Sequence, residues 1–460
     1  MLRRPWIALV IAAIVMCVLF ARGRPDFVAS DPLWYSAIAH QLSVDPASVF
    51  SGHELHPFVM RIGLTAPLAL IYAVFGVSSV TTNLPALLSA LVVLCVIFAA
   101  MPTSRAKLVG LAIGVLSAAL LYEAIILSAD LPCAALMSVS VLWLEHRDRP
   151  RGRWWLAAAA AAWLAAFLVK ETAVWCAPVW IYAVIVDARR GLLARYVPAL
   201  AIGGLLGIGY LWLCAVLWGD PFARIHGIDA IGDEHAWSLH GHPLRDWLAR
   251  LIWQPPLLFA GLFKATLIPA IAAIWLAPRD KRIWLVALAT FTALYWFGST
   301  SVTRYVPLPI SSRMALPILP PLLVCAGMAL DAAIDWTSWR RLVVVVVAVM
   351  IALPSLRVMY RLSVRKRPEA AAFAELAREA SDGAPIELVC GEPRCLAIAP
   401  WYFGYAVPPN LAIVDDHGKL PNAPRVRVLF DKLRERSSTP PELPRLAGDA
   451  TAGLYDGNAH

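Results

Sequence analysis

The chain has 460 residues, of which 60% are apolar and only 15% are charged, whereas soluble domains average roughly 45–50% and about 25%. This composition excludes a disordered or collagen-like chain and argues against a soluble cytosolic enzyme, because so few charged residues cannot cover the surface of soluble domains. A lipid bilayer can bury the apolar surplus. The net charge of +9 lies in clusters between apolar runs, which indicates membrane topology, and we expect no nucleic-acid partner.

Apolar runs long enough to cross a membrane recur from Trp6 onward. The first run, residues 6–21, has no small-residue cleavage site after it, so we interpret it as an uncleaved first helix. The run 108–144 is too long for one crossing, and Asp130 and Pro132 predict its break. The run 154–186 breaks at Lys170-Glu171 by the same argument. The other predicted spans cover residues 84–101, 197–218, 256–277, 283–298, 314–334 and 342–356.

The distribution of arginine and lysine predicts the orientation. Residues 57–101 fit two crossings, or one crossing preceded by a surface helix at 57–75. With one crossing, the short basic loops all share a side with Arg3 and Arg4, and such loops stay in the cytoplasm. We therefore predict an all-α polytopic membrane protein with about 11 spans, amino terminus inside and carboxyl terminus outside. Its long first external loop covers about residues 23–83.

The tail differs in character from the first 356 residues. Over residues 357–460, prolines, charges and short alternating runs predict a small external α/β domain with a helix at 370–380 and three or four strands. Four basic residues at 361–367 lie outside the last span, against the positive-inside trend. Long terminal domains cross largely regardless of charge, so we keep this orientation.

Two of the eight cysteines stand apart from the others. Six lie in predicted spans and are most simply small apolar fillers. Cys390 and Cys395 flank four residues in the predicted external domain, where a local disulfide and two free thiols are both open.

Ionisable residues gather at the predicted external face. A charge at the bilayer centre costs at least ~2.5–3.5 kcal/mol, so each one near a span needs a reason. In the predicted topology Asp31, Asp130, Lys170, Glu171 and Arg313 all lie at or beyond the external face. A transporter would instead gather polar groups at mid-membrane, on broken helices in two related halves. The pattern favours chemistry at the external surface, where carboxylates act as base or metal ligand and cations hold a phosphate.

Five short motifs follow one another between residues 31 and 317. They are Asp31-Pro32-Leu33-Trp34-Tyr35, His56-Pro57 with Phe75-Gly76, Asp130-Leu131-Pro132, Lys170-Glu171, and Arg313-Met314-Ala315-Leu316-Pro317. In this order they resemble the C-type glycosyltransferases, the protein mannosyltransferases and aminoarabinose transferases. Pro32 stands where that family has a second acid, Asn83 where it often has arginine, His56 where it has lysine, and Met314 where it has an aromatic residue. These departures leave the substrate open.

The resemblance implies transfer of a sugar, with inversion, from a polyprenyl-phosphate donor to an acceptor on the outer face of the bacterial cytoplasmic membrane. The acceptor could be a glycan, a lipid or a protein. Asp31 and Asp130 are the candidate catalytic residues, with Asp31 as general base and Asp130 orienting a cation or the acceptor. A divalent metal between these two acids is a further possibility. Candidates for holding the donor phosphate are Lys170, Arg313, His56 and Arg61, and candidates for lining the site or binding the acceptor are Tyr35, Glu171 and Glu123.

Each candidate also has a structural explanation. Asp31 and Asp130 each stand shortly before a proline, as helix-capping residues do. Lys170 and Glu171 fit an interfacial pair, and Arg313 fits an interfacial anchor. Two other classes of protein stay open: a transporter or flippase of lipid-linked precursors, and a scaffold that presents the tail domain.

Overall fold

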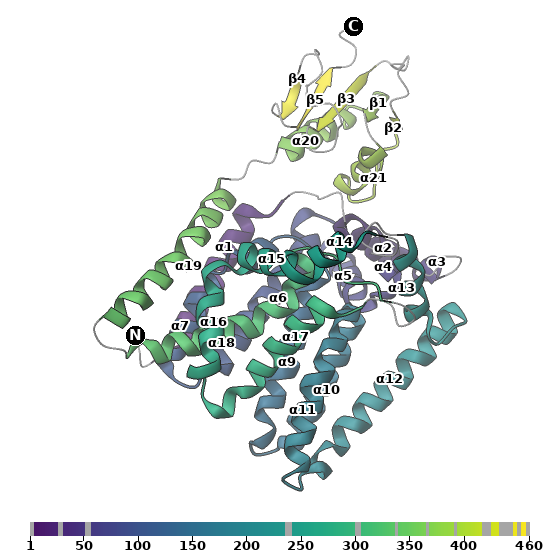
Figure 1. The fold of residues 1–460 in the computed structure, drawn as a ribbon. Coiled ribbons are helices and arrows are strands. Elements are labelled where there is room, and N and C mark those ends of the chain that lie inside the picture. Colours follow the sequence, from purple (N-terminus) through teal and green to yellow (C-terminus); the bar gives the residue numbers. More distant parts are fainter. Residues whose placement is uncertain are drawn as a thin grey trace.

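The computed structural model describes residues 4–25, 31–50, 57–234, 242–299, 305–335, 339–364, 368–390, 393–415, 425–431, 445–448 and 452–456. Most of these residues form a helical bundle, and the tail lies at one end of it (Figure 1). The helices of the amino-terminal half are α1 (Trp6–Gly23), α2 (Asp31–Val44), α3 (Pro46–Phe50), α4 (Pro57–Met60), α5 (Ile62–Phe75), α6 (Ser79–Ala100), α7 (Ser104–Val115), α8 (Ala118–Glu123), α9 (Asp130–Glu145), α10 (Gly152–Val169), η2 (Glu171–Cys176), α11 (Ala177–Ala188) and α12 (Val197–Trp218).

The carboxyl-terminal half continues the bundle and then leaves it. Its helices are α13 (Ala223–Glu234), α14 (Leu244–Leu248), α15 (Gln254–Phe263), η5 (Lys264–Thr266), α16 (Leu267–Leu276), α17 (Arg282–Phe297), η7 (Arg313–Ile318), α18 (Leu319–Ile334) and α19 (Trp339–Ser363). Helix α19 runs beyond the predicted end of the last span at residue 356 and leads into the tail (Figure 1).

The chain is a multi-pass membrane protein. Among the described residues, eight helical segments are long and apolar enough to cross a bilayer. Helix α12 shows the reason most clearly, since Leu200 and Leu205 are 72% and 73% exposed in a helix without a charged residue. Such a surface is stable only against lipid or another apolar partner. Helices α7, α9 and α17 lie in three further predicted spans, but with 12, 16 and 16 residues they are shorter than the roughly 20 residues that a crossing needs. The total of about 11 spans therefore stays a prediction.

Both long apolar runs break at the polar residues that predicted their breaks, and the first is also interrupted at Leu116-Ser117, between α7 and α8. Helix α8 ends at Glu123 and α9 begins at Asp130, with Pro132 in the first turn, where its missing N–H costs no hydrogen bond. Helix α10 ends at Val169 because Lys170 is extended, with φ −155° and ψ 147°. Both breaks place ionisable side chains at helix ends, where they can meet.

The tail contains a mixed sheet in the order β2-β1-β3-β5-β4. Its elements are α20 (Pro368–Ala380), β1 (Ile386–Cys390), α21 (Pro393–Tyr402), β2 (Leu411–Asp415), β3 (Val426–Asp431), β4 (Arg445–Gly448) and β5 (Ala452–Asp456). Strand β1 pairs in parallel with β2 and β3, and β5 pairs antiparallel with β3 and β4. Phe373 and Leu376 of α20 pack against Ile386 and Leu388 of β1, and these side chains belong to the hydrophobic core of the tail.

The tail docks on the helix that opens the first loop. Tyr405 stacks on His40 of α2, with ring centroids 4.5 Å apart, and its hydroxyl donates to Ser36 Oγ at 3.3 Å. Ser36 and Tyr72 of α5 share a 2.7 Å hydrogen bond. Figure 1 shows α21 on the side of the tail that faces α2 and α5. The tail therefore contacts the helix that carries Asp31 and Tyr35.

Candidate active site at the ends of α2, α9, α10 and η7

The first pair of the candidate site joins the two most distant motifs. Asp31 lies in the first turn of α2, and Arg313 begins the short helix η7. Arg313 Nη1 donates to Asp31 Oδ2 at 3.0 Å. The Asp31 side chain keeps 29% of its surface exposed, so a substrate hydroxyl can approach the carboxylate. The arginine holds the carboxylate in place without covering it.

The second pair is buried. Lys170 Nζ forms an ion pair with Asp130 Oδ1, and the two residues are 3% and 2% exposed. The same ammonium lies 3.1 Å from Met314 Sδ. Since Met314 follows Arg313, η7 connects this pair to the first. In this structure the ammonium of Lys170 is therefore paired with Asp130. The role of Lys170 as a ligand of the donor phosphate stays a prediction.

The third group of charges surrounds Glu171. Arg61 Nε and Nη2 donate to the two carboxylate oxygens of Glu171 at 3.2 and 3.0 Å, a bidentate arrangement. Arg61 Nη1 also donates to the Tyr35 hydroxyl. Burial raises the pKa of the Tyr35 phenol, with the Arg61 charge opposing, so Tyr35 stays protonated at neutral pH. Arg224 Nη2 donates to Glu171 Oε1 at 3.2 Å, so two guanidinium groups share one carboxylate.

The structure brings most of the predicted residues together. Asp31 contacts Arg313, and η7 contacts Lys170, which pairs with Asp130. Next to Lys170, Glu171 contacts Arg61, which in turn contacts Tyr35. Glu123, at the end of α8, is 4% exposed and lies within electrostatic range of Asp130, Lys170 and Arg313. His56 lies outside the described residues. The side chains of Cys390 and Cys395 also lie outside the described part of the chain, and their disulfide stays a prediction.

The sequence analysis did not select Arg224. It lies in the first turn of α13, outside all of the short motifs. Its side chain is 3% exposed, and its guanidinium lies over the Phe167 ring at 4.6 Å from the centroid. The signal that could have drawn attention to it is its position six residues after the end of the predicted span 197–218.

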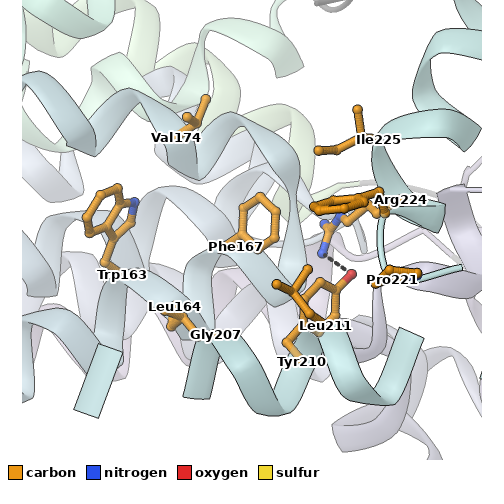
Figure 2. Close-up of a pocket in the computed structure, with 11 residues that line it drawn as sticks. Trp163, Leu164, Phe167, Val174, Gly207, Tyr210, Leu211, Pro221, Arg224 and Ile225 are labelled. Carbon is orange, nitrogen blue, oxygen red and sulfur yellow. Dashed lines mark hydrogen bonds between the residues drawn. The ribbon is translucent and has the colours of Figure 1, made fainter. Parts of the chain in front are cut away.

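An apolar cavity opens beside this third group of charges. It has a volume of about 360 Å³ and is lined by residues of α10, η2, α12, α13 and the connection between α12 and α13: Trp163, Leu164, Phe167, Val174, Gly207, Tyr210, Leu211, Pro221, Phe222, Arg224 and Ile225. Figure 2 shows Arg224 at one end, where its Nη1 donates to the Tyr210 hydroxyl at 3.4 Å. An apolar cavity with one cation at its end fits an amphiphile with an anionic head.

The ion pairs of the two aspartates affect how well their carboxylates could bind a metal ion. Asp31 and Asp130 are paired with Arg313 and Lys170, respectively. Among the described residues, no group of three His, Cys, Asp or Glu side chains could hold an ion. Two carboxylates that each already contact a cation are a poor donor set for a divalent ion. A divalent ion between them would have to displace these two cations, and such a metal stays a prediction.

A close helix approach positions Arg61, and this gives a first prediction. A Cβ on Gly63 would lie 2.7 Å from the Leu168 carbonyl carbon and 2.8 Å from the Val169 nitrogen. Gly63→Ala is expected to push α5 away from α10, separate Arg61 from Glu171 and lower the free energy of unfolding by about 1–3 kcal/mol. Thermal unfolding in detergent measures this. Gly204→Ala is the control, because nothing lies within 4 Å of its Cβ; equal effects of both variants would contradict the prediction.

Comparison with known proteins gives a match in structure but not in sequence. No protein-family model matches the chain, and no curated protein matches it. ArnT from Cupriavidus metallidurans in the apo state is 15% identical with a TM-score of 0.57, and the match covers 98% of this chain and 97% of that one. The same protein bound to undecaprenyl phosphate gives a TM-score of 0.56 at 15% identity, covering 98% of both chains.

A second solved protein matches over part of its length. The Archaeoglobus fulgidus oligosaccharyltransferase in complex with Zn and sulfate is 14% identical with a TM-score of 0.55, and the match covers 86% of this chain and 61% of that one. The resemblance drawn from the short motifs is confirmed at the level of the fold. The chain has the fold of ArnT over nearly its whole length.

Proposed function

We propose that this protein is a membrane glycosyltransferase that moves a sugar from a polyprenyl-phosphate donor to an acceptor hydroxyl at the external face of the bacterial cytoplasmic membrane. The observation that carries the proposal is the convergence of an accessible carboxylate, Asp31, with the cations Arg313, Arg61 and Arg224 beside an apolar cavity. The shared fold with ArnT, seen there with undecaprenyl phosphate, supports a lipid-linked donor. The acceptor is a glycan, a lipid or a protein.

The proposed chemistry starts at Asp31. Its carboxylate takes the proton of the acceptor hydroxyl while that oxygen attacks the anomeric carbon of the sugar. The bond from the anomeric carbon to the phosphate oxygen breaks, and the electron pair leaves with the polyprenyl phosphate. Attack from the face opposite the phosphate inverts the anomeric centre. Arg313 keeps Asp31 in position through its 3.0 Å hydrogen bond.

The donor is proposed to enter with its first isoprenoid units in the apolar cavity and its phosphate toward Arg224 and Arg61. These two guanidinium groups share Glu171, which leaves a net positive charge there. Among the described residues, the buried Arg224 Nε has no hydrogen-bond partner, so its N–H is available to a phosphate oxygen. Negative charge that develops on the leaving phosphate is stabilised most by fixed cations in such a dry site.

Transfer by the purified protein tests the proposal. The protein is reconstituted in vesicles with a polyprenyl phosphate that carries a radiolabelled sugar, and an extract of envelope glycans and lipids supplies the acceptor. The proposal expects label in the acceptor fraction and an equal amount of free polyprenyl phosphate. Movement of the intact labelled donor across the bilayer, with no free polyprenyl phosphate, would show a flippase and contradict the proposal.

The donor cavity gives a second prediction. Gly207 lines it, and a Cβ there meets no atom within 4 Å, so a larger side chain fits the fold and fills the cavity. Gly207→Leu is expected to raise the KM for the donor about tenfold, which corresponds to a loss of about 1.4 kcal/mol of binding, with kcat little changed. Gly204→Leu is the matched control, since it lies on the same helix with equally open space but outside the cavity lining. An unchanged KM in Gly207→Leu would place the donor elsewhere.

A further inference from the structure

A second cavity lies away from the proposed active site. It has a volume of about 410 Å³ and is lined by Lys264 of η5 and by residues of α19: Leu353, Pro354, Arg357, Val358 and Arg361. None of these residues belongs to the donor cavity or to the candidate catalytic groups. This cavity therefore needs an explanation of its own.

The backbone at Lys264 is in an unusual conformation. Lys264 has φ 49° and ψ −136°, between the end of α15 and the start of α16. A positive φ is uncommon for a residue other than glycine, and such strain persists where the surroundings hold it and often serves a function. Here it belongs to the turn η5 that packs against α19 and lines the cavity with a lysine.

The three polar lining residues all carry positive charge. Arg357 and Arg361 are four residues apart on α19, so they share one helix face, where like charges repel. Among the described residues, neither they nor Lys264 form an ion pair with a carboxylate, and no acid is among the lining residues. An anion in the cavity would relieve the repulsion. The cavity also gives a role to Arg361, one of the basic residues that interrupt the positive-inside pattern after the last span.

The surroundings indicate what kind of anion binds. On α19, Leu353 and Tyr360 are 61% and 68% exposed, and Ile268 of α16 is half exposed. These apolar faces are suited to lipid tails, while arginine and lysine side chains at a membrane surface bind lipid phosphates. We propose that the cavity binds the phosphate of an anionic membrane lipid, which bridges Lys264 and the α19 arginines and holds η5 against the last helix. This site is distinct from the donor site.

Lipid retention by the full-length protein tests the proposal. Native mass spectrometry and thermal unfolding compare protein in detergent with phosphatidylglycerol, phosphatidylcholine or inorganic phosphate added. We expect phosphatidylglycerol to stay bound and to raise the Tm, with much smaller effects of phosphatidylcholine and of inorganic phosphate. If inorganic phosphate gives the whole effect and the lipid adds nothing, the site takes a free phosphate and the lipid proposal is wrong.

Charge-neutral variants locate the site. The double variant Arg357→Gln, Arg361→Gln is expected to raise the Kd for phosphatidylglycerol at least tenfold, an effect of about 1.4 kcal/mol. Arg189→Gln, Arg279→Gln is the matched control, since it removes two exposed arginines outside this cavity. Equal lipid retention by the two double variants would overturn the proposal. Neither readout depends on sugar transfer, so this result is independent of the proposed glycosyltransferase activity.

Discussion

Asp31→Asn is expected to lower kcat for sugar transfer by about 10²- to 10⁴-fold, the usual contribution of a general base. The amide has the size of the carboxylate, and its oxygen can still accept the hydrogen bond from Arg313, which the structure places at 3.0 Å. It cannot take the proton of an acceptor hydroxyl. The KM for the donor and the amount of folded protein are therefore expected to change little. Transfer from a labelled donor in vesicles gives both kinetic constants.

Asp45→Asn is the matched control for this variant. Asp45 directly follows α2, and its carboxylate accepts a hydrogen bond from the Ser48 backbone rather than from a site residue. It is expected to keep wild-type transfer. The result also separates the classes of protein that the sequence leaves open, because neither a flippase nor a scaffold needs a base at position 31. Wild-type kcat in Asp31→Asn would remove Asp31 from the proposed chemistry.

Lys170→Met is expected to lower the free energy of unfolding by about 3–5 kcal/mol, because it leaves the Asp130 carboxylate buried without its partner. Both residues are nearly inaccessible, at 3% and 2% exposure. The double variant Lys170→Met, Asp130→Asn removes both charges and is expected to recover most of this loss. Thermal unfolding in detergent measures the three proteins side by side.

An exposed ion pair supplies the control for Lys170→Met. Arg190 and Asp148 lie 3.2 Å apart, and their side chains are about half exposed. Arg190→Met is expected to cost at most about 1 kcal/mol, because water and salt screen such pairs. If Lys170→Met costs no more than Arg190→Met, the buried pair does not hold α9 and α10 together. The double variant also tests the predicted phosphate role of Lys170: a KM for the donor close to the wild-type value would show that Lys170 positions Asp130 and does not bind phosphate.

The membrane character of the fold follows from the sequence, whereas some helix ends do not. Long apolar runs have one physical solution, a helix with all backbone groups paired, and the break before Asp130 was marked by an acid and a proline. The end of α19 was not marked in this way. Its apolar run stops near residue 356, but the helix continues to Ser363 because helix propensity does not depend on hydropathy.

The sequence indicates which residues belong to the candidate site more readily than which of them form ion pairs with one another. Asp130, Lys170, Glu171 and Arg313 stand at the breaks or ends of apolar runs, which is visible locally. The pairing of Asp31 with Arg313 joins residues 282 positions apart and depends on helix packing that no local pattern encodes. For the same reason the sequence analysis did not pair Lys170 with Asp130; the structure shows that ion pair, and the phosphate role of Lys170 stays a prediction. Arg224 was missed because it belongs to none of the short motifs.

The most direct test of the central claim is mass spectrometry of the cell envelope. It compares cells with the wild-type protein, cells without it, and cells with Asp31→Asn expressed at the wild-type level. The proposed function predicts that one glycan, lipid or protein species loses the mass of one sugar in the second and third strains alike, with the lipid-linked donor accumulating in both. An envelope restored to wild type by Asp31→Asn, or unchanged by loss of the protein, would contradict the account.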